Sequence, residues 1–441
     1  MNQELLSERW HRLSMNRRRF IQSAAAFLGA AALSPGTTVL GADPVRNDPR
    51  HGSLCETRSG TRAVPNRVYV AKNGDFAQNT NKIWDMLGGP ESYFAPDDVV
   101  VIKANAQWPH QGYTHTGCIK TVIDRILAIP GFSGELLICD NVQVYGSTGQ
   151  FGFDATPSYR NHNWPDHNWN SLAAEYQGLG HPVATVQWLN STGTITGPAD
   201  GEGWIRTFWS FHGQDSYFSY PIFQSPLSGN MIDMKYGVWA GGGYTGQAVK
   251  TIVMPTLNNH GWGGEDYAGI TSAVKSFIGA TENHGGVSGT FSGHYNWHRT
   301  SFGRSRADYC GELTALFIQQ CYTPVLYITP AIWSGHESRT GNAVQTDTVL
   351  ACDNPATLDY VACRDVISPY AAFLDPDQSN NTRAQILGCI SGGIGSIDPG
   401  IMSIEIFDFD QPAVPSVTLT GLFAALGIVG LEMIRNRGKQ Y

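Results

Sequence analysis

The chain of 441 residues is 41% hydrophobic and only 15% charged, and it contains 50 glycines and 23 prolines. This composition excludes an intrinsically disordered chain, a collagen-like fibre and a coiled coil, and predicts a globular protein with many turns. Without residues 1–42 and 412–441, 21 basic and 34 acidic residues remain, and this net charge of −13 excludes nucleic acid as an expected partner, since phosphates are bound mainly by basic side chains.

The N-terminal residues 15–33 combine a basic cluster with an Ala-rich, weakly apolar run. Arg17 and Arg18, followed by Phe20, are typical of a twin-arginine signal, so we expect export through the twin-arginine translocase to the periplasm or cell surface. An amphipathic helix is the alternative, but the apolar run has no polar face. Residues 1–42 are therefore excluded from the fold. Because this route exports folded proteins that often carry a cofactor, it favours a cofactor without identifying one, and the cofactor remains unknown.

Short runs rich in β-branched residues predict strands at Arg67–Ala71, Val99–Lys103, Leu136–Cys139, Val183–Trp188, Val249–Met254, Val325–Thr329 and Ile401–Phe407. Apolar residues at helical spacing predict helices at Cys118–Ile129, Ala268–Ile278 and Ala356–Ile367. Strands and helices thus alternate along residues 43–411. We expect an α/β fold whose largely parallel sheet is flanked by helices.

Residues 145–245 differ in composition, since Asn, Gly, Ser, Tyr and Trp crowd them and few periodic segments appear. Disordered segments are poor in aromatic residues, so we expect a Trp/Gly-rich insertion rather than a linker. Its tryptophans are either core residues or faces for a sugar to stack on: Trp164, Trp169, Trp188, Trp204 and Trp209. The Gly-rich run Trp239–Gln247 precedes a predicted strand, which favours a turn over a phosphate-binding loop.

Polar residues follow two predicted strands. Lys103 and Asn105 end the first, Thr114 lies in the loop that opens the next helix, and Asp140 ends the second strand. Ligands of open parallel sheets bind at the carboxyl ends of strands and at helix N-termini. A lysine at the end of an apolar strand needs a negative partner or access to solvent, so a ligand, water and a core carboxylate all remain open for Lys103.

Two further stretches carry candidate site residues. His260 lies in a polar, Gly-rich loop after a predicted strand, and Thr271 and Lys275 are four residues apart, which places them on one face of the predicted helix. Asp353 and Asp359 flank the start of another helix. Asp353 is either the N-cap of that helix, because a proline follows closely, or a ligand-binding residue.

In this order, the motifs I-K-A-N, T-H-T, C-D-N, P-x-x-x-x-H, T-x-x-x-K and C-D-N-P-x-x-x-D resemble those of the domain-of-unknown-function family 362, over roughly residues 65–400. The resemblance implies an α/β fold and the location of a site, but no reaction, because the activity of the family is not established. Carried over position by position, the matching residues are Lys103, Asn105, Thr114, Asp140, His260, Thr271, Lys275, Asp353 and Asp359.

The chain also departs from the family pattern. Ala104, Asn258 and Ser276 stand where the family usually has proline, lysine and asparagine, and the stretch ITPAI around Pro330 lacks an expected carboxylate. The Cys-rich ferredoxin segment that often accompanies the family is absent from the sequence. We therefore expect no iron–sulfur cluster in this chain.

The eight cysteines are dispersed and form no C-x-x-C motif, which gives no support to a structural zinc or iron–sulfur site. Some cysteines can pair in an oxidising compartment, whereas Cys139, Cys352 and Cys389 lie in or beside apolar runs and are expected as buried thiols. Histidine groups at His294 and His298 and at His162, Asp166 and His167 have spacings compatible with a metal, but packed or surface histidines are the expected alternative, and the metal remains unknown. His336 and Glu337 follow the Val325–Thr329 strand and are expected near the same site.

Near the C-terminus, Val417–Ile434 is an apolar run followed by three basic residues. As a helix it measures about 27 Å, enough for the hydrocarbon core of a thin bilayer. We expect a membrane anchor or a sorting tail over residues 412–441, with a closing amphipathic helix as the alternative.

These observations favour an enzyme that acts on a small anionic substrate, with a cofactor or metal. Its expected catalytic residues are Lys103, His260 and Lys275, and two lysines in one cleft favour a carboxylate or phosphate. Two aspartates there are also able to hold a hard divalent cation. The alternative is a non-catalytic surface protein that recognises a glycan or a partner through the Trp-rich insertion.

Overall fold

The fold is given by a computed structural model that describes residues 66–106, 108, 110–141, 152–156, 164–188, 192–211, 214–261, 264–282, 306–339 and 341–411. The chain divides into two units, Met1–Thr57 and Arg58–Tyr441. Only the second contains described residues. The expected export signal and the expected C-terminal anchor both lie outside the described residues.

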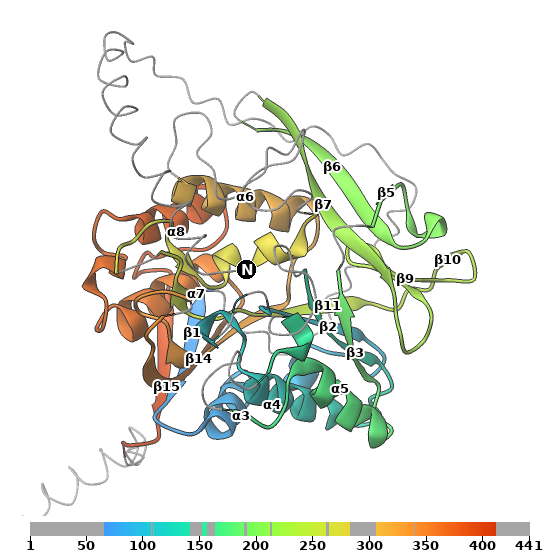
Figure 1. Cartoon of the computed structure of the whole chain (residues 1–441), viewed down its shortest axis with the longest axis horizontal. Helices are drawn as coiled ribbons and strands as arrows, with labels where there is room; N and C mark the ends of the chain where they lie inside the picture. The colour runs from blue at the N-terminus through green and yellow to red at the C-terminus, as the bar shows by residue number, and fades with distance from the viewer. Residues whose placement is uncertain are drawn as a thin grey trace, which may run out of the picture. The chain divides into compact units, whose positions relative to one another are not determined.

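The core of the second unit is a large, mostly parallel sheet (Figure 1). Within the described ranges its strand order is β16-β1-β15-β14-β11-β2-β3-β4. The bounds are β1 Arg67–Lys72, β2 Val99–Ala104, β3 Glu135–Asp140, β4 Val183–Gln187, β11 Val249–Met254, β14 Leu326–Ser334, β15 Val344–Cys352 and β16 Ser403–Asp408. Strands β14, β11, β2, β3 and β4 are parallel, and β15 is antiparallel to both of its neighbours. The predicted α/β class and the seven predicted strands are confirmed.

Helices cover both faces of this sheet (Figure 1). On one face lie α3 (Phe76–Met86), α4 (Thr116–Leu127) and α5 (Trp169–Gly178); on the other lie α6 (Arg306–Gln320), α7 (Pro355–Val361), α8 (Asn381–Ser391) and the 3-10 helix η6 (Val274–Ala280). A π-helical turn, η7 (Ala362–Ile367), continues α7, and short 3-10 turns are η1 Pro90–Ser92, η2 His110–Gly112, η3 Gly152–Asp154, η5 Pro198–Asp200 and η8 Ala372–Leu374. The helices predicted at Cys118–Ile129 and Ala356–Ile367 correspond to α4 and to α7 with η7.

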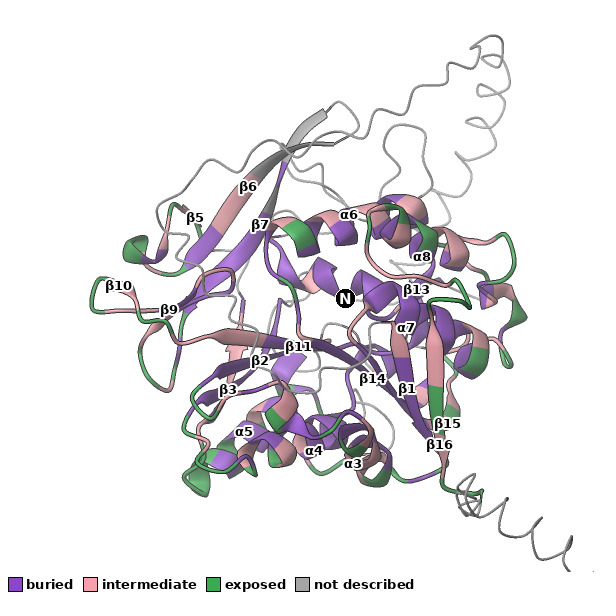
Figure 2. Cartoon of the chain, turned by 180° about the vertical axis from the view of Figure 1, so that it is seen from behind, coloured by how far each residue is buried: buried purple, intermediate pink, exposed green. Residues whose placement is uncertain are grey.

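Side chains of the central strands alternate between the two faces, as expected of a strand. Val100 and Ile102 of β2 pack on the side of α3 and α4, whereas Val99 and Val101 pack on the side of η6 and α6. Figure 2 shows the central strands buried, while β16 at the edge carries exposed residues. A side chain at Lys103 therefore points to the same side as η6.

The helix predicted at Ala268–Ile278 is wrong. Ile270–Thr271 forms the short strand β13, which pairs with β12 (Asn258–Asn259), and η6 begins at Val274. Gly269 has a φ of +73°, outside the helical region, and strand pairing then takes the backbone groups that a helix would use. Thr271 and Lys275 consequently do not share a helix face.

A second sheet, with the order β10-β9-β8-β7-β6-β5 in the described part of the chain, falls within the range predicted as an insertion. Its strands are β5 Thr194–Ile195, β6 Gly203–Phe211, β7 Gln214–Gln224, β8 Met231–Asp233, β9 Gly237–Ala240 and β10 Gly243–Tyr244. From the same range, α5 and β4 belong to the main sheet, so the second sheet is the part that lies outside it. Gly241 and Gly242, with φ of +59° and +87°, form the predicted turn between β9 and β10.

The cysteines in the described residues are buried free thiols: Cys118, Cys139, Cys310, Cys321, Cys352, Cys363 and Cys389. This confirms the prediction for Cys139, Cys352 and Cys389. Burial raises the pKa of Cys118 to about 12 and that of Cys310 to about 11, so these thiols stay protonated and unreactive. Over the described ranges, no helix combines the length and the apolar character that crossing a bilayer requires.

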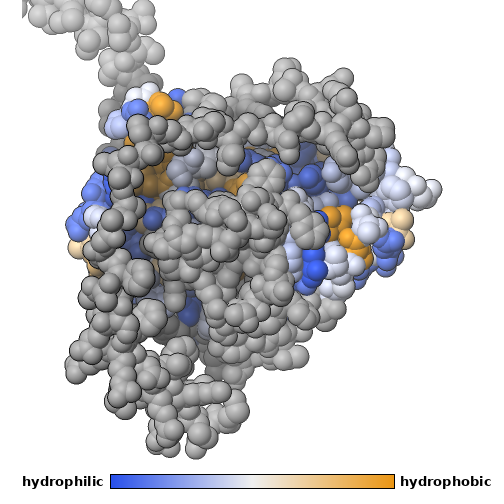
Figure 3. All heavy atoms as spheres, turned by 90° about the horizontal axis from the view of Figure 1, so that it is seen from above, coloured by the Kyte–Doolittle hydropathy of each residue, from blue (hydrophilic) through white to orange (hydrophobic). Residues whose placement is uncertain are grey.

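Several large hydrophobic side chains are exposed on the described surface. Ile401, Ile406 and Phe409 lie in or beside β16, whereas Leu179 and Tyr370 come from other parts of the chain. Where described residues are visible from above, small groups of hydrophobic residues lie beside hydrophilic ones (Figure 3). Isolated exposed hydrophobic residues are normal on protein surfaces, so none of them identifies a partner.

Candidate functional site

The candidate site lies where two neighbouring parallel strands send the chain in opposite directions. After β2 the chain passes through α4 on one face to reach β3, and after β11 it passes through α6 on the other face to reach β14. Open α/β sheets bind ligands at such a switch point, outside the carboxyl ends of the strands. The residues at the ends of β2 and β11 are therefore the first candidates.

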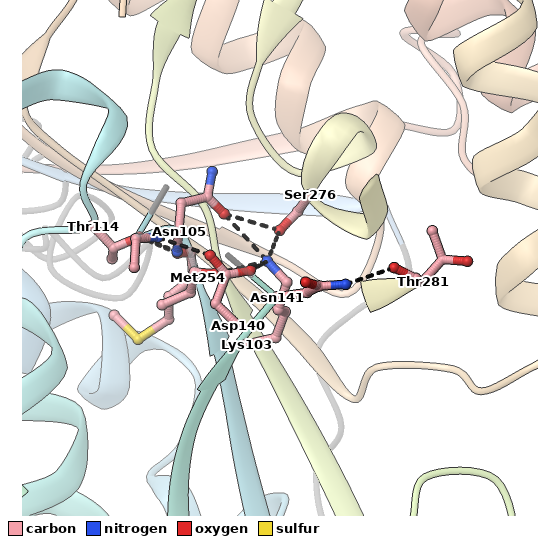
Figure 4. Close-up of polar contacts among 10 residues, drawn as sticks. Lys103, Asn105, Thr114, Asp140, Asn141, Met254, Ser276 and Thr281 are labelled. Carbon is pink, nitrogen blue, oxygen red and sulfur yellow. Dashed lines mark hydrogen bonds and ion pairs between the residues drawn. The ribbon is translucent and has the colours of Figure 1, made fainter. Parts of the chain in front are cut away.

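A buried ion pair joins the ends of β2 and β3 (Figure 4). Lys103 is 1% exposed, and its Nζ lies 3.0 Å from Oδ1 of Asp140. The same Nζ donates to the Ala104 carbonyl at 2.7 Å and lies 3.3 Å from Oγ of Ser276 and 3.4 Å from Oδ1 of Asn105. An ammonium group has three N–H donors, so protein groups satisfy Lys103, and a core carboxylate is its negative partner.

Asp140 is held from both sides. Its second carboxylate oxygen, Oδ2, accepts from the Ala106 N–H at 2.8 Å. Burial raises the pKa of Asp140, and the Lys103 ammonium and the Ala106 N–H oppose that rise. Helix η6 packs directly on the pair, because a Cβ added at Gly279 would lie 2.4 Å from Asp140 Oδ1 and 3.0 Å from Lys103 Nζ.

Asn105 and Thr114 connect the loops that follow the strands. The Thr114 hydroxyl donates to the Met254 carbonyl at the end of β11 at 2.8 Å and accepts from the Asn105 N–H at 2.9 Å. After β3, the Asn141 side chain donates to the Thr281 carbonyl at 2.9 Å (Figure 4). These bonds tie β2, β3 and β11 to the segment that carries η6.

Lys275 lies one residue before Ser276 on η6, but its surroundings differ from those of Lys103. Its side chain is buried, with 4% of the residue exposed, and its Nζ donates to the Ala268 carbonyl. Among the described residues, Nζ has no other hydrogen-bond partner and no carboxylate within 4.0 Å. Two of its three N–H donors are thus unused there, and burial lowers the pKa of Lys275 to about 8.

Asp359 holds the start of η6. This fully buried carboxylate accepts from the Ala273 N–H at 2.8 Å and from the Val274 N–H at 2.9 Å. Burial raises the pKa of Asp359 to about 7, against the effect of these two N–H groups and of the nearby Lys275. The predicted residue Asp359 is therefore near Lys275 and orients the helix that carries it.

His260 and Thr271 meet across the β12-β13 pair. His260 Nδ1 lies 2.8 Å from Oγ1 of Thr271, and the His260 carbonyl accepts from Nη1 of Arg339 at 2.9 Å. The Arg339 guanidinium is buried and lies 4.1 Å from the centre of the Trp108 ring. Arg339 and Trp108 were not predicted, although Arg339 follows the end of β14 and obeys the same strand-end rule as Lys103.

The loop after β14 also contains His336 and Glu337, which the sequence predicted near the site. Gly335 forms a bridge with Asn258, and the Glu337 carbonyl accepts from the Asn259 side chain at 2.9 Å. This loop therefore lies beside the loop after β11, as expected.

Asp353 does not join these residues. Strand β15 is antiparallel to β14, so its carboxyl end lies at the opposite edge of the sheet from Lys103 and Asp140. There Asp353 accepts from the Asn66 N–H at 3.3 Å. The predicted N-cap role is also wrong, because the cap of α7 is Asn354. Asp140 and Asp353 consequently cannot share a cation.

In the described part of the chain, no group of three or more His, Cys, Asp or Glu side chains is arranged to hold a metal ion. His294, His298 and His162 lie outside the described residues. His167 Nε2 lies 2.7 Å from Oε2 of Glu175, and its Nδ1 is 3.2 Å from the Ser171 hydroxyl. His167 is thus held by residues of α5.

No family model matches the chain, and no curated protein or solved structure shows significant similarity to it. The resemblance to the domain-of-unknown-function family 362 therefore stays a prediction from the ordered motifs.

Proposed function

We propose that the protein is an enzyme that acts on a small anionic substrate at the carboxyl ends of β2 and β11. In this proposal Lys275 attracts the anion and transfers a proton. The supporting observation is the difference between two buried lysines. Lys103 has an ion-pair partner and a full set of acceptors, whereas Lys275 has one carbonyl partner among the described residues.

A buried ammonium without a counter-ion is costly, so either a proton is lost or an anion binds. A pKa of about 8 for Lys275 makes both outcomes accessible near neutral pH, and a proton-transfer group works best when its pKa lies near the operating pH. Arg339 adds a second buried cation near Lys275, and its charge contributes, after burial, to the lowered pKa of Lys275.

The other predicted site residues take supporting roles in this proposal. Lys103, Asp140 and Thr114 are engaged by protein groups, and Asn105 contacts Lys103 and Ser276 through its Oδ1, so we assign these residues to positioning η6 and the strand ends. His260 is half-buried and hydrogen-bonded to Thr271, and it is the candidate for a second proton-transfer group. Export to the periplasm or cell surface is part of the proposal and rests on residues 15–33 alone.

The test measures thermal unfolding of the purified chain with inorganic phosphate or malonate, against sodium chloride at equal ionic strength. A ligand that binds only the folded state at ten times its Kd stabilises it by about 1.4 kcal/mol. We expect this stabilisation by the anion in the wild type and in the surface variant Lys120→Met, whose lysine pairs with Asp124 on α4. The Lys275→Met variant should not be stabilised by the anion. An equal rise in Lys275→Met would contradict the proposal.

The alternative, recognition of a glycan by the Trp-rich range, has less support. Trp169, Trp188 and Trp204 are buried in the core and have no open ring face to offer a sugar. Trp164 is half-buried and packs against Phe76 and His167. These positions favour core packing for Trp169, Trp188 and Trp204.

A further inference from the structure

We propose that Lys275 forms an imine with its substrate, which makes the substrate a small aldehyde or ketone that also carries a carboxylate or phosphate. This inference rests on the proposed function, because it assumes that a small anion reaches Lys275. It adds the covalent step and the carbonyl group.

The contacts of the two buried lysines distinguish a structural amine from a reactive one. The Lys103 ammonium lies 3.0 Å from a carboxylate, and its donors are engaged. Lys275 has a single backbone acceptor and no carboxylate at ion-pair distance among the described residues. An amine must be neutral to attack a carbonyl carbon, and a desolvated lysine without an ion pair meets this condition at the lowest cost.

Lys275 is buried, but the loop that supplies its acceptor contains exposed residues. Its acceptor, the Ala268 carbonyl, belongs to a loop whose residues Gly264, Glu265 and Tyr267 are exposed. A carbonyl oxygen of a substrate that approaches through this loop would replace Ala268 as the partner of Nζ. The rest of η6 is held in place by Asp359 and by the contact of Ser276 with Lys103, so the amine is presented from a fixed element.

Charged groups suited to both parts of such a substrate surround Lys275. Arg339 is close enough to lower the pKa of Lys275, and its guanidinium is suited to a carboxylate or phosphate. Asp266 and Asp359 carry the opposite charge, and each acts to raise the pKa of Lys275. Asp359, with a pKa raised to about 7, is partly protonated near neutral pH, and from α7 it accepts from the N–H groups at the start of η6.

The reaction balances without an oxidant or reductant. The Nζ lone pair attacks the carbonyl carbon and forms a C–N bond, and the carbonyl oxygen takes up a proton to give a carbinolamine. The nitrogen loses its two protons, one after the attack and one as the C=N bond forms, and the hydroxyl leaves as water with one added proton. Water is the only product released, and the imine nitrogen replaces the primary amine of Lys275.

The test incubates the full chain with pyruvate or glyoxylate at pH 8 and reduces any imine with cyanoborohydride. Intact mass and peptide mapping then locate the adduct. We expect one adduct, on Lys275, because lowering a lysine pKa from 10.5 to about 8 raises its neutral fraction at pH 8 on the order of a hundredfold. Labelling should fall as the pH drops below 8. Lys275→Arg keeps a cation but cannot form an imine, so it should lose the adduct, whereas Lys120→Met should keep it.

The outcomes separate this inference from the proposed function. Stabilisation by phosphate that depends on Lys275, without an adduct on that residue, would overturn imine formation and leave anion binding in place. Labelling spread evenly over surface lysines, and unchanged in a folded Lys275→Arg variant, would also overturn it. If neither phosphate stabilisation nor an adduct depends on Lys275, both proposals fail.

Discussion

The substitution Gly279→Ala tests how closely η6 packs on the ion pair of Lys103 and Asp140. The φ of Gly279 is not in the left-handed region, so alanine meets no backbone penalty there. Its added Cβ, however, would lie 2.4 Å from Asp140 Oδ1, and separations below 3.0 Å are essentially never seen for real Cβ atoms. Either the carboxylate or η6 has to move.

The cost follows from what that movement disrupts. Forcing one extra carbon into a packed interior costs about 1–3 kcal/mol. Complete loss of a buried ion-pair partner costs about 3–5 kcal/mol, but a shifted carboxylate keeps part of its interaction with Lys103. We therefore expect Gly279→Ala to lower the free energy of unfolding by about 2–4 kcal/mol.

Urea unfolding followed by tryptophan fluorescence measures this loss as a lower midpoint with an unchanged slope. The matched control is Gly178→Ala at the end of α5, where an added Cβ meets no atom within 4 Å. Alanine there should be neutral or stabilise by up to about 1 kcal/mol. In an Asp140→Ala background the cost of Gly279→Ala should largely disappear, because the atom it displaces is gone.

Equal stability of Gly279→Ala and Gly178→Ala would refute this reasoning. So would a full loss in the Asp140→Ala background, because the cost would then arise elsewhere in η6.

Two further predictions concern the buried charges. Asp140→Asn should lower the free energy of unfolding by about 3–5 kcal/mol because it leaves Lys103 buried without a counter-ion. The double variant Lys103→Met/Asp140→Leu should lose less stability than this single variant. If the stability losses at the two positions were simply additive in urea titrations, that result would argue against the ion pair. The folded-state pKa of Lys275, about 8, lies below the ordinary value of 10.5. Between these two pH values the folded state therefore binds fewer protons than the unfolded state. The free energy of unfolding should rise with pH across pH 8–10.5, by on the order of 3 kcal/mol. Lys275→Met should lack this rise, and parallel stability–pH curves for the two proteins would contradict it.

The strands could be predicted because their signal is local. Runs such as Val99–Lys103 and Leu136–Cys139 are apolar throughout, as expected of strands buried on both faces. Strand β15 was not predicted because its first half is polar and partly exposed, and only its second half is buried. Helix α3 was missed for a similar reason, since few apolar residues mark its buried side.

Some of the predicted site residues depend on local sequence in the same way, and others depend on contacts with distant segments. Lys103, Asn105, Thr114 and Asp140 meet because β2 and β3 are consecutive, parallel strands, and consecutive parallel strands bring their carboxyl ends to one edge. Thr271 and Lys275 were placed on a helix that does not form, because pairing with β12 and the Asp359 carboxylate decide the backbone there. These partners lie up to 86 residues away along the chain.

The sequence by itself therefore determined the fold class, seven strands of the main sheet and the residues at the ends of β2 and β3, since each depends on a short stretch of chain. Only the tertiary structure decided the direction of β15, which carries Asp353 to the far edge, and which of the two lysines has a carboxylate partner. Both depend on contacts between segments distant in sequence. The charge state of a buried lysine is set by those contacts and by burial, and neither can be read from neighbouring residues.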